Sequence, residues 1–383
     1  MKRTVLLIDA FAEEGGAEVV LRTYLRHLDR HRFRPVAVFL SPGPLAGQLR
    51  ELGVRVYVFP RHRRRHAWKV AWVILAIAAI ARREKAGIVH SNGFGPHLYG
   101  SFVALLARCR SVWQIYDPPT ALSWRQSIIK WLYLRLPTSR YVFSADITRD
   151  VFLKGKTVTS PTMLYPASDR VQPGMTGDST TLDGDVRTQF GLGATTRVVL
   201  MLARLQPTKG HDTLLQAAPH ILQAFPDTRF VIVGGSLFGM HKEYGRNIQK
   251  TVQLMGLNDA VIFTGFCDNE TVRTLLFMCE LLVHPAFGEP FGLAVTEAMA
   301  AGKPVVATRV EGPARIVLDG QTGILVEPGD VDALAAAICR LLQDPVEARA
   351  MGRRGLERVS ALYSATTLID ALEKLYDSLW KVG

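Results

Sequence analysis

Short apolar runs alternate with longer amphipathic stretches through the first 143 residues. Runs of four to eight apolar residues are typical of buried strands, and apolar positions spaced three and four apart are typical of helices. The strand candidates are Thr4–Ile8, Pro35–Leu40, Val54–Phe59, Ile88–His90, Ser111–Ile115 and Arg140–Phe143. The helix candidates are Ala17–Leu28, Leu45–Leu52, Trp68–Arg83, Leu98–Ala107 and Leu122–Leu134. This alternation predicts βαβ units, with a parallel sheet covered by helices on both faces.

The same alternation restarts after a polar interruption. Ala167–Asp185 is rich in Asp, Gly, Ser and Thr and lacks apolar periodicity, which predicts an interdomain connection or exposed loop. Further strands are then expected, with helices such as Asp212–Ala224 between them: Arg197–Ala203, Arg229–Val233, Val261–Thr264, Leu281–Val283 and Val305–Thr308. The pattern therefore predicts two doubly wound α/β domains, and a length of 383 residues also exceeds what one core usually serves. Ligands of such sheets bind beyond the carboxyl ends of the strands, which would place a cleft between two facing domains.

Composition limits the cellular compartment and the kinds of site that are expected for this protein. The four cysteines lie far apart, form no C-x-x-C pair and have no metal-ligand spacing with histidines, so we expect reduced thiols in a cytosolic protein. Asp183-Gly184-Asp185 resembles a metal-binding D-x-D motif, but its polar surroundings favour a solvated loop. Met1-Lys2-Arg3 leads directly into the first strand, so no signal peptide is expected. The longest apolar run, Ala67–Ala81, would span about 22 Å as a helix, too short for a bilayer core of about 30 Å.

Charge is distributed unevenly around a net value of +12. Residues 1–165 carry 26 Lys and Arg against 10 Asp and Glu, whereas the remaining residues carry 20 against 24. The basic cluster Arg61-His-Arg-Arg-Arg-His66 precedes the apolar Ala67–Ala81 helix, a combination that favours an anionic membrane surface as a partner. The alternative is a buried core helix with a basic flank. Nucleic acid is not an expected partner, because no recognised nucleic-acid motif accompanies the charge.

The segment His284–Gly302 carries the strongest chemical signal. A strand is expected to enter a turn, and a helix is expected to begin near Gly292 or Leu293, so that the amides of Phe291, Gly292 and Leu293 form an anion site. Glu289 precedes this helix and Glu297 lies about one turn inside it, so both can face the same cleft. Ordinary structural roles for the two glutamates, or the carboxylate pair of a glycoside hydrolase, are the alternatives. The hydrolase alternative leaves the anion site unexplained.

Two further segments lie where a phosphate would bind. Arg204 and Lys209 follow the first strand of the second domain, and such a loop suits a diphosphate because Arg forks onto phosphate oxygens while Lys supplies a point charge. Gly15-Gly16 lies between the first strand and the first helix, where glycines allow backbone to approach a phosphate or sugar. The pattern is not G-x-G-x-x-G, so a dinucleotide site is not indicated.

Together these segments resemble the retaining glycosyltransferase family 4, whose GT-B fold consists of two Rossmann-like domains facing each other across a cleft. The resemblance covers nearly the whole chain, including Gly234-Gly235, Thr264–Phe266, Ala301–Thr308 and Asp319–Gly323. It implies an acceptor domain over residues 1–166 with a crossover helix at 366–383, and a nucleotide-sugar donor domain over residues 190–365.

The resemblance also implies roles for individual residues. Arg204 and Lys209 would bind the donor diphosphate, Glu289 would hold hydroxyls of the donor sugar, and Glu297 would accept hydrogen bonds from the ribose. The other implied donor contacts are Gly16 by the phosphate or acceptor, the amides of Phe291, Gly292 and Leu293 by sugar and phosphate, and Gly265 and Phe266 by the base. Charge growing on the leaving oxygen would be stabilised without a metal, so neither metal nor cofactor is expected.

The first domain departs from the family pattern. The family often has a histidine after the strand Ser111–Ile115, where this chain has Tyr116 followed by Asp117. Asp117 is the catalytic candidate to replace it, and a different handling of the acceptor is the alternative. His90 is a second candidate, with an ordinary packed histidine as the alternative. Arg315 stands where the family has Glu, and no role is assigned to it.

The resemblance therefore predicts a hexosyltransferase-type enzyme (EC 2.4) that moves a sugar from a UDP- or GDP-linked donor to a lipid-linked or polysaccharide acceptor with retention of configuration. Its expected location is cytoplasmic, either free or peripheral on the inner face of the cytoplasmic membrane. A sugar-nucleotide epimerase, a phosphorylase and a non-catalytic nucleotide-sugar-binding module are the alternatives.

Overall fold

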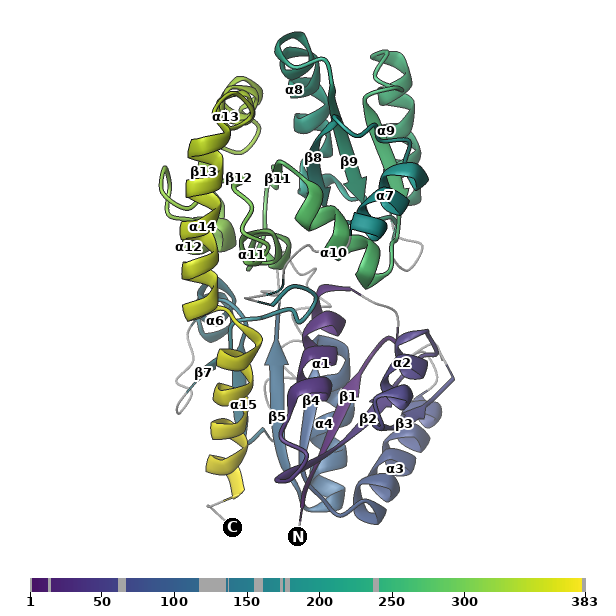
Figure 1. The fold of residues 1–383 in the computed structure, drawn as a ribbon. Helices are drawn as coiled ribbons and strands as arrows, with labels where there is room; N and C mark the ends of the chain where they lie inside the picture. Colours follow the sequence, from purple (N-terminus) through teal and green to yellow (C-terminus); the bar gives the residue numbers. More distant parts are fainter. Residues whose placement is uncertain are drawn as a thin grey trace. The chain divides into compact units, whose positions relative to one another are not determined.

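The computed structural model describes residues 2–12, 15–60, 67–116, 136, 138–154, 161–172, 175, 180–236 and 241–380. The chain divides into two compact units (Figure 1). Unit 1 comprises Met1–Ala167 together with Ala365–Gly383, and unit 2 comprises Ser168–Ser364.

Unit 1 is built on a seven-stranded parallel sheet in the order β3-β2-β1-β4-β5-β6-β7. Its strands are β1 (Arg3–Asp9), β2 (Phe33–Phe39), β3 (Arg55–Val58), β4 (Ala86–Asn92), β5 (Arg110–Ile115), β6 (Arg140–Phe143) and β7 (Thr162–Met163). Its described helices are α1 (Gly16–His27), α2 (Leu45–Glu51), α3 (Ala67–Arg83), α4 (Phe94–Ala107), α6 (Asp146–Leu153) and α15 (Ala365–Trp380). The strand order reverses between β1 and β4, which makes their carboxyl ends the switch point where doubly wound sheets bind ligands.

Unit 2 contains a six-stranded parallel sheet in the order β10-β9-β8-β11-β12-β13. Its strands are β8 (Arg197–Leu202), β9 (Thr228–Val233), β10 (Val261–Gly265), β11 (Leu281–His284), β12 (Val305–Thr308) and β13 (Ile324–Val326). Its described helices are α7 (Thr180–Gln189), the 3-10 turn η1 (Pro207–Lys209), α8 (His211–Ala224), α9 (Lys242–Leu254), α10 (Asn269–Met278), α11 (Leu293–Ala300), α12 (Glu311–Ile316), α13 (Val331–Gln343) and α14 (Pro345–Leu362). The reversal here lies between β8 and β11, so the loops after these two strands meet.

The predicted α/β class with two doubly wound sheets is confirmed, and the differences are local. Part of the predicted loop Ala167–Asp185 is helical, because α7 begins at Thr180. Asp183 and Asp185 therefore lie on this helix, where Asp183 forms an ion pair with Arg187 one turn later (3.3 Å). The predicted helix Leu122–Leu134 lies outside the described residues.

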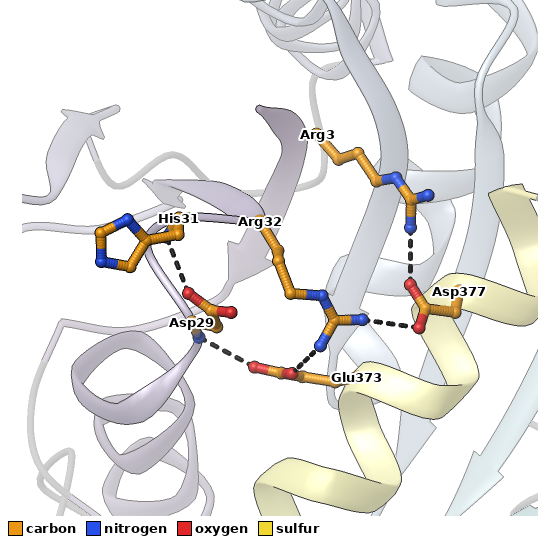
Figure 2. Close-up of polar contacts among 6 residues, drawn as sticks. All are labelled: Arg3, Asp29, His31, Arg32, Glu373 and Asp377. Atoms are coloured by element: carbon orange, nitrogen blue, oxygen red, sulfur yellow. Dashed lines mark hydrogen bonds and ion pairs between the residues drawn. The ribbon is translucent and has the colours of Figure 1, made fainter. Parts of the chain in front are cut away.

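Helix α15, the last described element of the chain, packs on unit 1 near the start of β1 and β2. Figure 2 shows Asp377 contacting Arg3 (2.5 Å) and Arg32 (2.6 Å), while Glu373 accepts from Arg32 (2.5 Å) and from the Asp29 amide (2.8 Å). These pairs are partly exposed, so each contributes little by itself.

Apolar and aromatic contacts complete this attachment. Tyr376 is fully buried against Phe33, with ring centroids 5.7 Å apart. The Trp380 ring lies where a side chain on Gly87 would be, 2.4 Å from an ideal Cβ built there. Any larger residue at position 87 would displace the helix end, so α15 belongs to the core of unit 1.

We expect Tyr376→Phe to lower the free energy of unfolding by about 1–3 kcal/mol, because it leaves a buried ring nitrogen without a partner. The Tyr376 hydroxyl lies 2.7 Å from His90 Nδ1, and both side chains are buried. Urea unfolding measures the effect as a lower midpoint. Lys374→Gln, an exposed position on the same helix, is the control and should leave the midpoint unchanged. Equal midpoints for the two variants would contradict the prediction.

Candidate functional site

Three side chains meet at the carboxyl edge of the unit 2 sheet. Lys209, in the loop after β8, places Nζ 2.6 Å from Glu289 Oε2. His284, the last residue of β11, places Nε2 3.2 Å from the same oxygen. Their side chains are 12%, 15% and 3% exposed in the order Lys209, Glu289, His284. The neighbouring strands β8 and β11 thus bring a cation, a carboxylate and an imidazole together, as the switch-point argument predicts for Lys209 and Glu289.

Glu289 is held in its ionised form. Burial by itself would raise the pKa of the Glu289 carboxyl, but the charge of Lys209 and the neighbouring His284 outweigh it and hold that pKa well below its usual value. The carboxylate is therefore negative across the physiological range and keeps Lys209 in place.

Gly210 allows the two loops to approach each other. It adopts a φ of +73°, and an ideal Cβ at this position would lie 1.8 Å from the Pro285 carbonyl oxygen. Beside it the Phe287 amide donates to the Thr208 carbonyl (2.9 Å). A residue without a side chain is required at 210 if the backbone that carries Lys209 is to lie against the turn that carries Glu289.

The predicted helix start is confirmed at Leu293. Gly292 precedes α11 with a φ of +105°, and its carbonyl accepts from the amides of Val295 (3.0 Å) and Thr296 (3.2 Å). The amides of Gly292 and Leu293 therefore lie ahead of the helical hydrogen-bond ladder, at the positive end of the helix dipole. The Glu289 carbonyl accepts from Gly312 (2.9 Å), which ties the turn before α11 to α12.

Glu297 lies inside α11 and is 4% exposed. Arg170 donates from Nη1 to both of its carboxylate oxygens (2.9 and 3.0 Å) and from Nε to Asn269 Oδ1 (2.8 Å). Arg170 is itself 14% exposed. Sequence reasoning missed it, since it falls in a segment interpreted as a loop and no periodic or motif signal distinguishes it.

The remaining predicted residues of unit 2 lie at the same edge of the sheet. Arg204 is exposed just after β8. Gly265 ends β10, and its carbonyl accepts from the Gly234 amide (2.8 Å). The Phe266 side chain is 56% exposed, and its ring lies over Gly235, 2.9 Å from an ideal Cβ. An aromatic face therefore borders the site.

In unit 1 the strand ends carry a hydrogen-bonded chain of polar side chains. Tyr116, which follows β5, donates to Asn92 Oδ1 (2.7 Å), and Asn92 donates from Nδ2 to Asp9 Oδ2 (2.5 Å). Burial raises the pKa of Asp9 to about 6, against the lowering effect of the Asn92 hydrogen bond. Tyr116 was singled out from the sequence, but its partners at the ends of β1 and β4 were not. Both partners are polar residues at the ends of buried strands, and that position next to the switch point is the sequence signal that could have identified them.

The other candidate site residues of unit 1 are Gly16, Asp117 and His90. Gly16 is the first residue of α1, and the preceding Gly15 amide donates to Glu18 Oε2 (3.1 Å). Asp117 lies outside the described residues. Of the two alternatives for His90, the structure shows the packed residue. Its ring contacts Tyr376 in the core, and burial lowers the pKa of His90 to about 3.

Comparison with known proteins supplies the family. A model described as "Glycosyl transferases group 1" matches residues 185–358, and one described as "Glycosyltransferase Family 4" matches residues 14–154. The chain belongs to the family 4 glycosyltransferases.

Curated relatives agree with this family 4 assignment. The chain is 36% identical over 200 residues to a GDP-mannose-dependent α-(1-6)-phosphatidylinositol monomannoside mannosyltransferase of Mycolicibacterium smegmatis, a match that covers 49% of this chain and 50% of the relative. It is 27% identical over 311 residues to an α-D-kanosaminyltransferase of Streptomyces kanamyceticus, covering 77% and 78%. The match thus spans about half the length of the first of these relatives.

Two solved structures share the fold of this chain. HepE of Anabaena, in complex with UDP and glucose, has a TM-score of 0.85 at 23% identity, covering 98% of this chain and 100% of the other. Sucrose-phosphate synthase of Thermosynechococcus elongatus has a TM-score of 0.79 at 22% identity, covering 100% of both chains. The GT-B fold implied by the sequence motifs is thereby confirmed.

No helix in the described ranges is long and apolar enough to cross a bilayer. Within the same ranges, no group of three His, Cys, Asp or Glu side chains is arranged to hold a metal ion.

Proposed function

We propose that this protein transfers a hexose from a nucleotide-sugar donor to a lipid-linked or polysaccharide acceptor, with retention of the anomeric configuration. The observation that carries the proposal is the Lys209–Glu289 ion pair (2.6 Å), placed at the switch point of unit 2 beside the start of α11. A fixed cation, a fixed carboxylate and the amides of Gly292 and Leu293 at the positive end of the helix dipole suit a sugar attached to a diphosphate.

The chemistry follows from where charge develops. When the bond between the anomeric carbon and the diphosphate breaks, negative charge grows on the diphosphate oxygen that leaves. Stabilising that charge lowers the barrier. Lys209, the exposed Arg204 and the amides at the start of α11 are the donors for it. Glu289 stays ionised and accepts hydrogen bonds from hydroxyls of the transferred sugar, while it keeps Lys209 oriented. No described residue needs to form a covalent bond in this scheme.

The nucleoside half is assigned to Glu297, Gly265 and Phe266. A carboxylate offers about four lone-pair sites, so Glu297 can bind Arg170 and still accept ribose hydroxyls. The exposed Phe266 ring offers a face for the base. The donor base is uracil or guanine, since one solved structure of the same fold holds UDP and a curated relative is named as GDP-mannose-dependent.

The acceptor side is assigned to unit 1. Gly16 and Asp117 are the proposed contacts, and Tyr116 is the side chain that stands where the family often has histidine. The Asp9–Asn92–Tyr116 chain fixes the tyrosine hydroxyl, so its orientation is set before an acceptor binds.

Nucleotide release from UDP-, GDP- and ADP-sugars, assayed with and without lipid-linked and polysaccharide acceptors, tests the proposal. Acceptor-dependent release from one donor class is expected. Product formed without acceptor would indicate an epimerase, and a requirement for inorganic phosphate would indicate a phosphorylase. Binding of nucleotide without turnover would indicate a binding module. Each of these three outcomes contradicts glycosyl transfer.

Arg170→Lys is expected to reduce the preference for ribonucleotides over 2′-deoxyribonucleotides by about tenfold, because a lysine cannot hold both oxygens of Glu297 in one orientation. Titration of UDP, GDP and their 2′-deoxy forms by calorimetry measures the ratio. Arg273→Ala, which removes a partly exposed cation on α10, is the control. A uniform loss of affinity for all four nucleotides would assign Arg170 a merely structural role.

A membrane surface is the proposed partner of α3. Trp68, Trp72 and Leu75 are spaced one turn apart on one helical face and are 57–68% exposed, whereas Val73 and Ile77 of the other face lie in the core. The helix ends in the exposed Arg82 and Arg83. An apolar stripe with basic residues suits the interface of an anionic bilayer. The basic cluster Arg61–His66 lies outside the described residues.

We expect Trp68→Ser/Trp72→Ser to lower co-sedimentation with phosphatidylglycerol vesicles at least about tenfold, because each buried aromatic ring contributes on the order of 1 kcal/mol or more. Binding of the unmodified protein should weaken as salt rises, and replacing Arg63, Arg64 and Arg65 by Ser should weaken it as well. Leu254→Ser, which removes a 78% exposed apolar side chain of unit 2, is the control. Vesicle binding equal to that of the control would refute docking through α3.

A further inference from the structure

A polar cavity lies in unit 1, at the edge of the sheet where the strands begin. It is open to solvent, has a volume of about 320 Å³ and is lined at its polar positions by Lys2, Arg30, Arg34, Arg55 and Glu84. Lys2 precedes β1, Arg34 and Arg55 lie at the start of β2 and β3, and Glu84 lies just before β4. The Asp9–Asn92–Tyr116 chain lies at the opposite ends of these strands, so the cavity is separate from the acceptor side proposed above.

Four cations face one carboxylate in this cavity, which leaves a net charge of about +3. Glu84 is 1% exposed and lies 2.6 Å from Arg55 and 3.3 Å from Arg34. Burial opposes its ionisation, but hydrogen bonds from Arg55 and Tyr57 lower the pKa of Glu84 below its usual value. The charge of Glu84 is therefore present, and it balances only one of the four cations.

The buried carboxylate also fixes the two guanidinium groups. Arg55 donates from Nη1 to both carboxylate oxygens of Glu84. Arg34 donates from Nε to Thr4 Oγ1 (3.1 Å) and from Nη2 to the main-chain carbonyl of Glu84, and the same Nη2 lies 3.3 Å from the Glu84 carboxylate. A guanidinium carries five N–H donors, so each retains donors that these bonds do not use. Arginines already held in place lose little conformational entropy when they bind a further acceptor.

Arg30 adds a cation whose charged form is disfavoured by partial burial. Burial lowers the pKa of Arg30, because removal from water disfavours its charge. It donates from Nη2 to the Leu25 carbonyl, a neutral partner. An anion bound in the cavity would offset this desolvation, and Lys2 adds a further positive charge to the lining.

From these observations we propose that the cavity binds a phosphate ester, with Arg30, Arg34, Arg55 and Lys2 as its ligands. Forked guanidinium groups match the oxygens of a phosphate, and a dianion balances the excess charge best. The volume is at the lower limit of small-molecule sites, which fits a phosphate and a small organic group. The phosphate belongs either to a soluble ester or to a lipid headgroup.

The test uses the full chain and inorganic phosphate, titrated by calorimetry. Lys2→Ser/Arg30→Ser leaves the Glu84 pairs intact and should weaken phosphate binding by at least about fivefold. Lys242→Ser/Arg246→Ser, at exposed positions of α9, removes the same charge elsewhere and should not. Arg204→Ser is included because phosphate could also occupy the proposed donor site, and the unit 1 site should survive it.

Vesicles distinguish the two sources of the phosphate. Preference for phosphatidic acid over phosphatidylglycerol at equal surface charge, lost in Lys2→Ser/Arg30→Ser, would identify a lipid phosphomonoester. Phosphate binding without this preference would identify a soluble ester. Phosphate binding that is absent, or that is lost in Arg204→Ser and retained in Lys2→Ser/Arg30→Ser, would overturn the proposal. Since the cavity is independent of nucleotide binding, its failure would leave the proposed transferase activity untouched.

Discussion

Glu289→Ala should lower kcat for glycosyl transfer by about a hundredfold to a thousandfold, the range found when a fixed electrostatic group is removed from an active site. The carboxylate is the partner of Lys209 at 2.6 Å, so its loss frees the lysine and also removes the proposed contact to the sugar. Initial rates at saturating donor and acceptor measure the change. Unchanged turnover would remove Glu289 from the mechanism.

Three companion variants show whether the pair acts as a unit. Lys209→Met leaves an ionised carboxylate buried without its cation, so it should cost activity and also lower stability. The double variant Lys209→Met/Glu289→Ala should lose little more activity than either single one, because paired groups are not additive. Glu270→Ala, a largely exposed carboxylate on α10, is the control and should turn over normally.

Gly210→Ala should lower the free energy of unfolding by about 3 kcal/mol or more and abolish transfer. A left-handed conformation costs an alanine about 1–2 kcal/mol, and relief of the contact with the Pro285 carbonyl requires backbone movement in addition. That movement would carry Lys209 away from Glu289. Urea unfolding and the initial-rate assay measure the two effects.

Gly256→Ala is the matched control for this substitution. Gly256 has a similar φ of +68°, but no atom lies within 4 Å of an ideal Cβ there. It should therefore show only the conformational cost of about 1 kcal/mol and retain activity. Equal unfolding midpoints for Gly210→Ala and Gly256→Ala would mean that the loops tolerate separation.

Much of the architecture could be predicted from the sequence because parallel sheets leave a strong local signal. Strands buried on both faces form continuous apolar runs, and the helices between them are amphipathic. The start of α11 was predictable as well, since a strand, a turn and a glycine precede an apolar helix within a dozen residues. Lys209 and Glu289 could each be predicted to lie at the carboxyl edge of the sheet, because each follows a parallel strand. Their ion pair could not be predicted, because it depends on the strand order that makes β8 and β11 neighbours.

The residues that sequence reasoning missed depend on contacts between distant segments. Arg170 reaches Glu297 across 127 positions, and Asn92 reaches Asp9 across 83. Neither contact leaves a periodic trace. Helix α7 was missed because most of its residues Thr180–Gln189 are polar and several, such as Thr, Asp and Gly, are weak helix formers. Helix α3 is apolar on both faces, so the sequence left a buried core helix as an alternative to a membrane-binding one. In the structure one face is buried and the other is exposed.

The packing of α15 on unit 1 makes unit 2 an insertion between two parts of one fold. Helix α15 follows some 200 residues of intervening chain, yet it supplies the packing partners of Phe33, Gly87 and His90. On the ribosome, the strands of unit 1 would emerge long before the helix that covers them, whereas unit 2 is continuous and can close first. Premature termination near Ser364 would therefore damage the unit that was synthesised first, with an apolar surface exposed to chaperones and proteases while unit 2 remains folded.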